Sequence, residues 1–545
     1  MEKNSVTWLP HLTSEIVADA RGQELDAYAV ALEGWRRGLT LKWHVKDSDK
    51  FNEIKTWYVD KPGKLFSLSD NVKTHYFFRT RGDKVSNEAV EIGMDKEKTK
   101  RYLADAGIPT PTGNRFTDSA LSDENILEYA SKIGFPVVLK PIDGSYGRGV
   151  ITNIKDDEEL IKSITYLRTE LNYSDVILEK FISGEEYRIY VVGEQVVAAI
   201  HRIPANVIGN GNNTIKDLIT KKNEERSRNP RLYSCPIKIN KEMEQFINKS
   251  GYSLESVPGN GETVFLTNKS NISIGGDPVD VLDIIPDNVK ETAVNAVNAI
   301  PDLSHGAVDL IIEEQGNDIK GIILELNPTA QIGSLLFPMK GYARDVPAAI
   351  IDYYFPETAN VKTDKEKIYF DFQEIIEPLV SRTATTVTVS AAPVGSIIAK
   401  KYIVSGEVQN IDYHRGLRKQ GLERRLSGYV TNQENGNIEI VVLGIDKNVI
   451  DEFKTTITDD LERSKVYEII EELWDEPVKV GFEVKGNLKN QLDQLNIMKL
   501  QLDYLRKEVR KAERQYKKYY RSFSWQITMP IRKIYDLFKY IRRFF

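Results

Sequence analysis

Cysteine is almost absent from this chain of 545 residues, in which Cys235 is the only one. A single cysteine excludes an internal disulfide bond and is typical of a reducing compartment such as the cytoplasm. Long apolar runs are missing too, since no stretch approaches the roughly 20 consecutive apolar residues that a membrane-spanning helix needs. The first ten residues lack the apolar segment of a secretory signal. We therefore expect a cytoplasmic protein.

Neither sign of charge is in large excess, and the net charge of the whole chain is only −6. The C-terminal stretch is the exception, because residues 506–545 contain thirteen Lys and Arg residues against three acidic ones. The acidic remainder, in a chain with 41% hydrophobic residues, has the composition of a globular protein and is long enough for three or more domains. We expect a separate role for the basic end and no nucleic-acid partner for either part.

A lysine followed by a glycine-rich loop marks residues 137–150, which read VVLKPIDGSYGRGV. The apolar start has the character of a strand that delivers Lys140 to the loop. Glycine tolerates positive φ and lets the backbone approach a phosphate chain. Successive N–H groups in such a turn form an anion cradle, to which Lys140 and Arg148 add full charge. The same pattern occurs in ordinary tight turns, so this stretch alone does not establish a phosphate-binding loop, and the other motifs of the chain are needed.

Acidic and amide side chains end two apolar runs further along the chain. Asp309 follows Gly-Ala-Val, and Glu325 and Asn327 lie in the run ILELNP. Glu325 and Asn327 are two residues apart, so on a strand their side chains face the same side. Three hard oxygen ligands beside a phosphate cradle are typical of a Mg²⁺ site.

Six motifs in family order carry a resemblance to the ATP-grasp superfamily of carboxylate–amine ligases: DKEKTK, IPTPTG, VVLKPIDGSYGRGV, ILEKFISGEEYRIYVVGEQVVAAIHRIPANVIGNGNNTI, NISIGGDPVDV and ILELNP. They lie within residues 94–355, and they look most like the ligase half of cyanophycin synthetase and bacterial glutathione-synthetase-type enzymes. The resemblance implies two α+β lobes that grip ATP between them. It also implies an enzyme that forms a C–N bond.

The resemblance assigns roles to individual residues. Lys96 and Lys140 would contact phosphates, and residues 143–149 would form the lid. Glu179 and the backbone at Phe181 would hold adenine. The ATP-binding set implied in this way comprises Lys96, Lys140, Gly144, Ser145, Gly147, Arg148, Gly149, Glu179, Phe181 and Glu186, the last on the ribose.

Metal binding and catalysis follow from the same resemblance. Asp309, Glu325 and Asn327 would bind two Mg²⁺ ions, with Mn²⁺ as an alternative. Arg188 and Arg202 would face the charge that develops on the transferred phosphoryl group. The chemistry needs such groups, because a carboxylate reacts with an amine only after phosphoryl transfer has made an acyl phosphate. No Ser-His-Asp or Cys-His set is required, and none is visible.

The acceptor region departs from the cyanophycin-type pattern. That family continues after its asparagine through Pro-Gly to an Arg and a His that bind the growing chain. Here Asn327 is followed by Pro-Thr-Ala-Gln-Ile-Gly-Ser-Leu. We therefore expect an amino-acid or peptide-type substrate and a carboxylate acceptor, without inferring an aspartate–arginine polymer. Lys340 and Arg344 are nearby replacements, and residues 205–281 are expected to be an insertion.

Residues 396–485 resemble acylphosphatase, a ferredoxin-like sandwich that holds phosphate in a glycine-rich loop. Asn432 matches the asparagine that positions water in that family. His414 stands at the position of its anchoring arginine, and Asp412 brings a carboxylate into the loop. A neutral histidine loses bidentate recognition of phosphate, and a carboxylate works against anion binding. We expect a degenerate site at His414 and Asn432, kept for binding or assembly.

A heptad pattern follows in residues 486–521. Its apolar positions alternate in steps of three and four: Leu495, Met498, Leu502, Leu505, Val509, Ala512, Tyr516 and Tyr519. The pattern is typical of a coiled coil and predicts a homo-oligomer; a helix lying on its own domain is the alternative. Residues 522–545 form a basic amphipathic tail, similar to the end of bacterial glycosyltransferases and related enzymes of surface-polysaccharide assembly. It predicts binding to an anionic membrane, with a core-packed helix as the alternative.

The predicted fold is mixed α+β (α/β mixed): an ATP-grasp two-lobed fold, a ferredoxin-like acylphosphatase sandwich, a coiled coil and an amphipathic helix. Residues 1–93 are expected to form a mixed α/β domain and residues 356–395 a linker. Three functions compete, namely a carboxylate–amine ligase at the inner face of the membrane, a phosphate hydrolase, and a scaffold that binds ATP without turnover. The ligase would act on a cell-envelope or polysaccharide precursor. The intact lysine and oxygen ligands favour the ligase.

Overall fold

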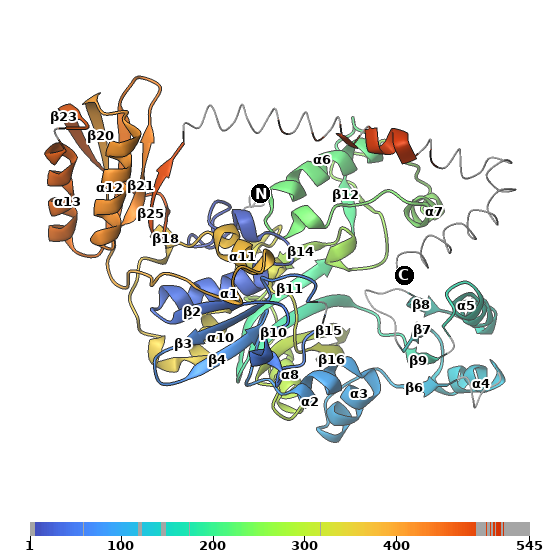
Figure 1. The fold of residues 1–545 in the computed structure, drawn as a ribbon. Coiled ribbons are helices and arrows are strands. Elements are labelled where there is room, and N and C mark those ends of the chain that lie inside the picture. Colours follow the sequence, from blue (N-terminus) through green and yellow to red (C-terminus); the bar gives the residue numbers. More distant parts are fainter. Residues whose placement is uncertain are drawn as a thin grey trace, which may run out of the picture. The chain divides into compact units, whose positions relative to one another are not determined.

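The computed structural model describes residues 6–57, 59–117, 123–142, 149–173, 175–316, 318–460 and 462–486, with single positions and short runs between 498 and 516. The chain divides into two units (Figure 1): Met1–Ile398 with Gly444–Asp446 and Asp475–Gly481, and Ala399–Leu443 with Lys447–Trp474 and Phe482–Phe545. The first unit contains the region that resembles ATP-grasp ligases. The second contains the region that resembles acylphosphatase.

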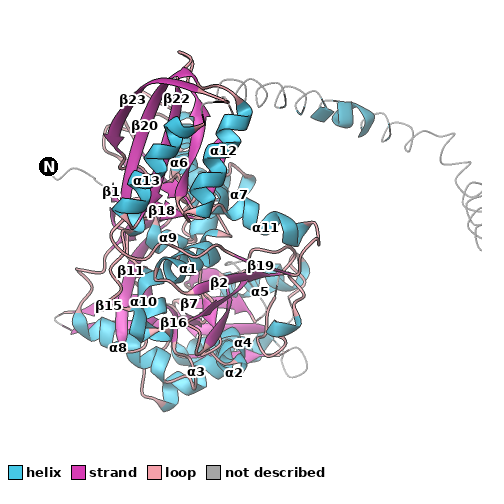
Figure 2. Ribbon diagram, turned by 60° about the vertical axis from the view of Figure 1, so that its left-hand side comes forward, coloured by secondary structure: helices cyan, strands magenta, loops and turns pink. Residues whose placement is uncertain are grey.

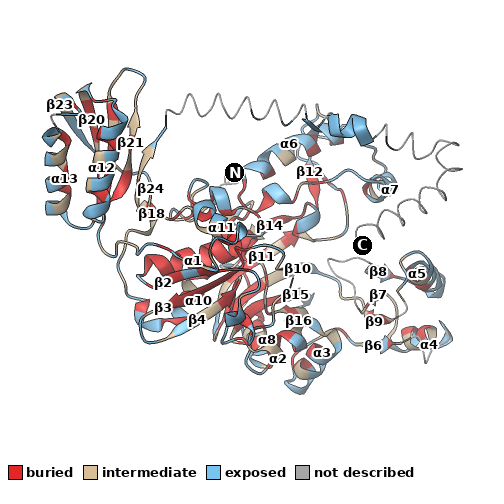
Figure 3. Ribbon diagram, in the orientation of Figure 1, coloured by how far each residue is buried: buried red, intermediate tan, exposed pale blue. Residues whose placement is uncertain are grey.

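The N-terminal part of the first unit is built around α1 (Leu25–Arg36), a helix in which every residue is buried (Figure 3). The helix packs on an antiparallel sheet of order β19-β2-β3-β4-β5. The strands are β2 (Thr40–His44), β3 (Leu65–Ser69), β4 (Thr74–Phe78), β5 (Arg81–Gly82) and β19 (Thr386–Thr388).

Strand β19 comes from residues 356–395, which the composition indicated as a linker. This stretch also contains α11 (Phe372–Val380). Val387 pairs with Trp43, so the stretch completes the N-terminal sheet. Alternating Thr and Val residues have high strand propensity, and here a free strand edge gives them a partner. The expectation of a linker therefore overlooked regular elements that need a distant sheet to form.

A four-stranded antiparallel sheet of order β6-β9-β7-β8 carries Lys140. Its strands are β6 (Gly113–Phe116), β7 (Val137–Pro141), β8 (Ile151–Ile154) and β9 (Val176–Lys180), and its helices are α4 (Asp123–Ile133) and α5 (Asp157–Thr169). Val137 and Leu139 enter a core shared with both helices. Because side chains alternate along a strand, Lys140 lies on the other face of the sheet.

The central sheet has the order β14-β11-β10-β15-β16 and is antiparallel throughout. Its strands are β10 (Glu185–Val192), β11 (Gln195–Ile203), β14 (Asp277–Asp280), β15 (His305–Gln315) and β16 (Asp318–Asn327). Ile189, Val308 and Ile323 belong to an apolar core on one face, together with residues of α2 (Asn87–Met94) and α8 (Asp287–Asn298). The opposite face is left for polar side chains.

Most of residues 205–281 form a small structure with its own apolar core, as an insertion would. Its elements are β12 (Asn206–Ile208), β13 (Thr263–Phe265), α6 (Ile215–Arg228) and α7 (Lys241–Lys249). Helix α6 begins with a reciprocal cap in which the Thr214 side chain accepts from the Asp217 N–H and the Asp217 side chain accepts from the Thr214 N–H.

Short elements complete the first unit. Strands β1 (Val6–Thr7) and β17 (Gly341–Tyr342) pair in parallel. Strands β18 (Ile368–Tyr369) and β24 (Val478–Lys479) also pair in parallel. The remaining helices are α3 (Lys96–Asp105), α9 (Gly333–Leu336) and α10 (Val346–Tyr354). The 3₁₀ turns are Ala18–Ala20, Asp49–Phe51, Leu232–Ser234, Ile272–Ile274, Pro356–Thr358 and Lys365–Lys367.

The second unit has the strand order β23-β20-β22-β21-β25. Figure 2 shows its strands β20, β22 and β23 beside helices α12 and α13. Its elements are β20 (Ile398–Glu407), α12 (Ile411–Glu423), β21 (Ser427–Asn432), β22 (Ile438–Gly444), α13 (Lys447–Asp459), β23 (Lys465–Leu473) and β25 (Phe482–Lys485). A βαββαβ chain with this order is the ferredoxin-like arrangement with one strand added. The mixed α/β fold class expected from the sequence is confirmed.

Beyond residue 486, the described heptad positions are all helical: Met498, Leu502, Leu505, Val509, Ala512 and Tyr516. Each of these side chains is exposed. Leu495, Tyr519 and the tail 522–545 lie outside the described residues, so the coiled coil and the amphipathic tail stay predictions. Within the part of the chain that the structure describes, no helix is both long and apolar enough to cross a membrane.

Candidate active site

The three predicted oxygen ligands meet on the polar face of the central sheet. Glu325 on β16 lies directly opposite Asp309 on β15. The Asn327 amide nitrogen lies 3.2 Å from Glu325 Oε1 and 3.4 Å from Asp309 Oδ2. Asp309 is 2% exposed. The hairpin therefore gathers two carboxylates and one amide around the buried side chain of Asp309.

Two arginines face this cluster from β10 and β11. Arg188 lies directly opposite Asp309 and donates to both of its oxygens, at 2.7 and 2.8 Å. Arg202 lies 3.1 Å from the same carboxylate and also contacts Glu186. The Nε–H of Arg202 is buried and has no hydrogen-bond partner among the described residues. Ser270, which the sequence analysis did not single out, also contacts Glu186.

Burial and neighbouring charges together shift the pKa values of Asp309 and Glu325 in opposite directions. Burial favours the neutral acid, but Arg188 and Arg202 outweigh it and hold the pKa of Asp309 well below its usual range. Burial and then the neighbouring charge of Asp309 raise the pKa of Glu325. The pKa of Arg188 is raised, because the charge of Asp309 overcomes the effect of burial.

The side chains present fit a divalent cation. They offer carboxylate and amide oxygens, which are the ligands that Mg²⁺ prefers. Asp309 is buried and Glu325 is half-buried beside it, and their mutual repulsion is the kind that a bound cation relieves. Asn327 donates its N–H groups toward both carboxylates, which leaves its amide oxygen for a ligand role.

A second cluster lies on the four-stranded sheet. Lys140 Nζ is 2.7 Å from Glu179 Oε2, and Lys100 Nζ contacts Glu179 Oε1. The family resemblance assigned a role to Lys96 of the same DKEKTK run and none to Lys100. Lys96 is half-buried at the first position of α3, and Lys100 follows one turn later on the same helix face. The side chain of Thr99, next to Lys100 in the sequence, is buried, which indicates that this turn of α3 faces the interior.

The adenine contacts expected around β9 differ from the structure in one respect. The Phe181 N–H already donates to the carbonyl of Pro136 at 3.0 Å. It is therefore occupied, and a backbone contact to adenine at this residue falls to the Phe181 carbonyl. The loop residues Gly144, Ser145, Gly147 and Arg148 lie outside the described residues. Gly149 is described, with φ of +76°, which favours glycine.

The two basic residues suggested for the acceptor differ in their surroundings. Arg344 donates to both oxygens of Asp280, at 2.8 and 2.7 Å, and also to Asp283 at 2.7 Å. Its charge is thus largely neutralised by the protein itself. Lys340 is exposed next to β14, where its carbonyl accepts from the Asp280 N–H. Of the two candidates, Lys340 is the better placed for an anionic substrate.

A buried histidine bonds to the backbone of the acylphosphatase-like loop. His414 is 2% exposed, and its Nε2 lies 3.0 Å from the carbonyl of Val408 in the same loop. Burial lowers the pKa of His414. Asn432 ends β21, and its side-chain oxygen is buried without a hydrogen-bond partner among the described residues. The histidine therefore stabilises the loop and has no charge to offer a phosphate at neutral pH.

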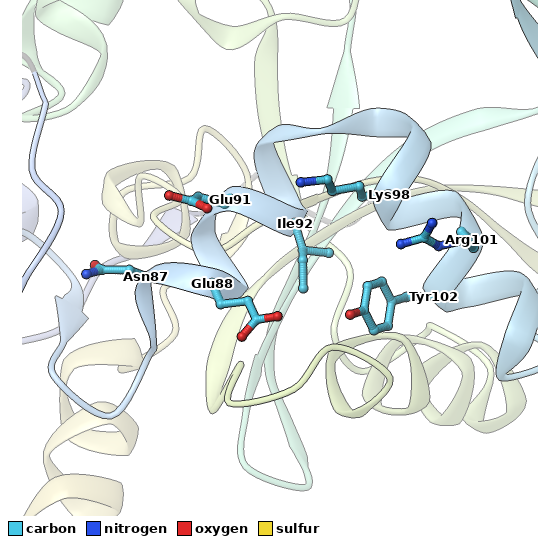
Figure 4. Close-up of a pocket in the computed structure, with 7 residues that line it drawn as sticks. All are labelled: Asn87, Glu88, Glu91, Ile92, Lys98, Arg101 and Tyr102. Carbon is cyan, nitrogen blue, oxygen red and sulfur yellow. The ribbon is translucent and has the colours of Figure 1, made fainter.

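A hollow of about 390 Å³ lies between α2 and α3 (Figure 4). It is lined by Asn87, Glu88, Glu91, Ile92, Lys98, Arg101 and Tyr102. None of the residues named for ATP or metal lines it. Lys98 and Arg101 point into the hollow, whereas Lys100 of the same helix contacts Glu179, so this hollow is separate from the proposed chemistry.

Comparison with known families finds two matching domains. Residues 93–226 match the RimK-like ATP-grasp domain, and residues 400–484 match the acylphosphatase family. The chain therefore carries an ATP-grasp domain followed by an acylphosphatase domain, as the sequence motifs predicted.

Individual relatives resemble the first domain. The chain is 34% identical over 300 residues to cyanophycin synthetase of Trichormus variabilis, which covers 54% of this chain and 32% of that protein. It is 34% identical over 308 residues to the glutathione biosynthesis bifunctional protein GshAB of Clostridium perfringens, covering 54% and 38%. The crystal structure of a bifunctional glutathione synthetase from Pasteurella multocida superposes with a TM-score of 0.42 and 26% identity, covering 54% and 40%. The chain thus spans about a third of the length of the curated relatives it matches.

Proposed function

We propose that this chain is an ATP- and Mg²⁺-dependent ligase that joins a carboxylate to an amine through an acyl phosphate. The observation that carries the proposal is the cluster of buried Asp309 with half-buried Glu325 and Asn327, which faces Arg188. Oxygen ligands and a guanidinium converge there as phosphoryl transfer requires. The match of the surrounding residues to an ATP-grasp domain supports this interpretation.

The reaction follows from the positions of these side chains. A substrate carboxylate oxygen attacks the γ-phosphorus of ATP, the bond to the bridging oxygen breaks, and ADP leaves. The amine then attacks the acyl carbon, loses a proton, and expels inorganic phosphate. Arg188 and Arg202 would neutralise charge on the transferred group, and Asp309, Glu325 and Asn327 would hold the metal. Bound Mg²⁺ supplies further neutralisation of phosphate charge.

An amino-acid or peptide-type substrate is the class that we propose, since the relatives are named for the synthesis of cyanophycin and glutathione. The other substrate would be a cell-envelope or polysaccharide precursor presented at the inner face of the membrane. The basic tail at residues 522–545 supports this location through its composition. Lys340 is our candidate for the group that meets the anionic end of the acceptor.

The test is ADP release from Mg·ATP in the presence of paired amino acids and envelope precursors. We expect turnover with at least one pair, and Glu325→Ala should lower it about 100-fold or more while leaving the fold intact, since it removes a charged oxygen ligand. Glu314→Ala, at an exposed position of the same hairpin, is the matched control. Full activity of Glu325→Ala would contradict the site.

We propose that the acylphosphatase domain no longer hydrolyses acyl phosphates and serves binding or assembly. Three features of its loop support this: His414 is buried and bonded to Val408, its pKa is lowered by burial, and Asp412 adds negative charge. The phosphate hydrolase is therefore the weaker of the competing functions.

We also propose that the chain self-associates through its heptad positions and binds membranes through its tail. Exposed apolar side chains at described heptad positions support the first part. The second part predicts that deleting residues 522–545 releases the protein from anionic vesicles without changing its ATP chemistry. Vesicle binding that is insensitive to salt would refute an electrostatic anchor.

A further inference from the structure

Arg231 is a buried arginine that follows helix α6 and contacts the loop after the proposed metal ligand Asn327. The residue is 7% exposed. Asn229 fixes the turn, because its Oδ1 accepts from the N–H groups of Arg231 and Leu232 at 2.9 and 3.1 Å. Its Nδ2 donates to the carbonyl of Phe337 at 3.0 Å. The local sequence therefore holds Arg231 against the segment that follows β16.

The loop after Asn327 lies beside this arginine. Arg231 Nη2 donates to Gln331 Oε1 at 2.5 Å, and a Cβ on Gly333 would lie 2.6 Å from Arg231 Cδ. The glycine therefore leaves room for the arginine stem. Gln331 is four residues beyond Asn327, so the chain keeps their Cα atoms within about 14 Å of each other. The Ala330 N–H donates to the Asn327 carbonyl at 3.2 Å, which turns the chain back between them.

The other side of the loop is held by the N-terminal part of the chain. Asp26 of α1 is 1% exposed, and its Oδ1 accepts from the Ile332 and Gly333 N–H groups at 3.0 and 3.1 Å. The second oxygen of Asp26 pairs with Arg79 at 2.5 Å. Asp26 thus fixes the loop and pairs with Arg79, and it forms no ion pair with Arg231 among the contacts of the described residues.

No carboxylate among the described residues pairs with Arg231. Besides the Gln331 amide, its partners are a thiol, Cys235 Sγ at 2.9 Å, and the Ser234 hydroxyl at 3.5 Å. Sulfur is a weak acceptor, and 3.5 Å is long for a hydrogen bond. Arg36 and Arg81 are buried too, but they donate to backbone carbonyl groups. Because a buried charge is costly unless it is well paired, Arg231 is a cation in need of an anion.

A second buried cation adds to the positive charge around Arg231. Burial lowers the pKa of Arg226, and the charge of Arg231 acts in the same direction, whereas Asp277 opposes it. Asp277 is shared by Arg226 and Lys222, at 2.9 and 2.5 Å. Three cationic groups thus meet one carboxylate here, which favours the binding of a further anion.

We propose that Arg231 binds the carboxylate of the amino-acid or peptide-type substrate, which the ligase therefore takes as an anion. The inference rests on the proposed function, since it assigns a site to one of its two substrates. The Nε–H and a second N–H of Nη2 have no partner among the described residues, so two parallel hydrogen bonds to a carboxylate are available. Lys340, the candidate for the other substrate, is exposed and lies in a different segment.

The test measures binding to the full-length protein in the presence of Mg²⁺ and a non-hydrolysable ATP analogue. Calorimetric titration compares amino acids and short peptides with their carboxamides, which lack the negative charge. We expect at least one free carboxylate to bind about 100-fold more tightly than its carboxamide, because only the carboxylate pairs with the buried guanidinium. In Arg231→Gln the binding of the carboxylate should fall by about 100-fold and that of the carboxamide should not change. Arg228→Gln, exposed at the end of the same helix, is the control and should behave like the unchanged protein.

A purely structural role for Arg231 gives a different pattern. In that case Arg231→Gln weakens the binding of both compounds equally, and this result overturns the inference, as does an unchanged protein without preference for the carboxylate. Should Arg231→Gln fail to fold, Arg231→Lys decides, because it keeps the charge and loses the planar fork. It should lower carboxylate binding by about tenfold and leave the carboxamide unaffected, and an equal loss for both overturns the inference.

Failure of the inference and failure of the proposed function are distinguishable in the same titrations. A protein that binds Mg·ATP but neither the carboxylates nor the carboxamides overturns the role of Arg231 and leaves the proposed ATP site in place. A protein that binds no Mg·ATP refutes the proposed function and the inference together.

Discussion

Asp309 and Glu325 are two carboxylates in contact whose environments push their pKa values apart. Asp309 is compensated by two guanidinium groups, whereas Glu325 meets burial and a like charge. Such pairs are frequent at functional sites, because a site that binds cations must keep anions close together before the cation arrives. These two carboxylates therefore favour a metal-binding and phosphoryl-transfer role for the polar face of the central sheet.

His305 makes a prediction about acid stability. It is fully buried between the hydroxyl groups of Tyr190 and Tyr354, and burial lowers its pKa to about 3. The unfolded chain binds a proton at this histidine below about pH 6.5 and the folded chain does not, so stability falls as the pH drops from 6.5 toward 3. Between pH 7 and pH 5 this effect amounts to about 2 kcal/mol.

The variant His305→Gln should lose that part of the pH dependence. Urea unfolding at pH 7 and pH 5 measures it, and we expect the decrease in unfolding free energy to be smaller in the variant by about 2 kcal/mol. An identical decrease in both proteins would show that His305 does not titrate in the unfolded chain as described.

At the level of secondary-structure elements, two turns with a glycine at positive φ differ in how closely they are packed. Gly149 precedes β8 with φ of +76°, and a Cβ there would lie 3.1 Å from Leu167 and Pro141 side-chain atoms. Gly107 after α3 has a similar φ of +71° but nothing within 4 Å of an added Cβ. Both glycines have a backbone conformation that other residues rarely adopt, but only at Gly149 would an added methyl group lie close to neighbouring side chains.

Gly149→Ala should consequently destabilise the protein more than Gly107→Ala. We expect about 1 kcal/mol for Gly107→Ala from positive φ alone, and a further 1 to 2 kcal/mol, roughly, for Gly149→Ala from overpacking. Thermal unfolding of both variants measures the difference. Equal losses would mean that β7 and α5 relax away from the added methyl group.

The acylphosphatase loop gives a second prediction at this scale. The full-length chain should hydrolyse a simple acyl phosphate no faster than buffer, because buried His414 cannot replace a phosphate-binding arginine. His414→Arg with Asp412→Gly should restore measurable hydrolysis. Rapid hydrolysis by the unchanged chain would instead favour an editing role, in which escaped acyl phosphates are destroyed.

For the molecule as a whole, the described positions after residue 486 are helical, and their apolar side chains are exposed. Met498, Leu502, Leu505 and Val509 are 64%, 49%, 60% and 56% exposed. Heptad spacing makes such a stripe complementary to a second copy of itself. The ligase would then act as an assembly whose catalytic units are joined by their C-terminal helices.

Replacing Leu502 and Leu505 by Glu should convert that assembly into monomers. Analytical ultracentrifugation should give a multiple of 62.1 kDa for the unchanged chain and 62.1 kDa for the variant. Arg510→Glu, at an exposed position off the apolar stripe, should leave the assembly intact. A monomeric unchanged chain would instead favour a helix that covers its own protein.

The two family resemblances, the fold class and the grouping of Asp309, Glu325 and Asn327 could be predicted from the sequence alone. These features depend on local order: motif spacing, side-chain alternation along strands, and strands whose ends carry polar groups. Arg188 was named from the resemblance, and the register of β10 places it directly against Asp309.

The partners of several charged side chains and one strand became visible only in the folded chain. Lys96 and Lys100 look alike in sequence, and Glu179 selects Lys100 because α3 and β9 meet there. Arg344 looked available until Asp280 and Asp283 were found to hold it, and β19 formed a strand only beside β2. Each of these outcomes depends on a contact between residues far apart in the chain, whose free energy is absent from any local pattern.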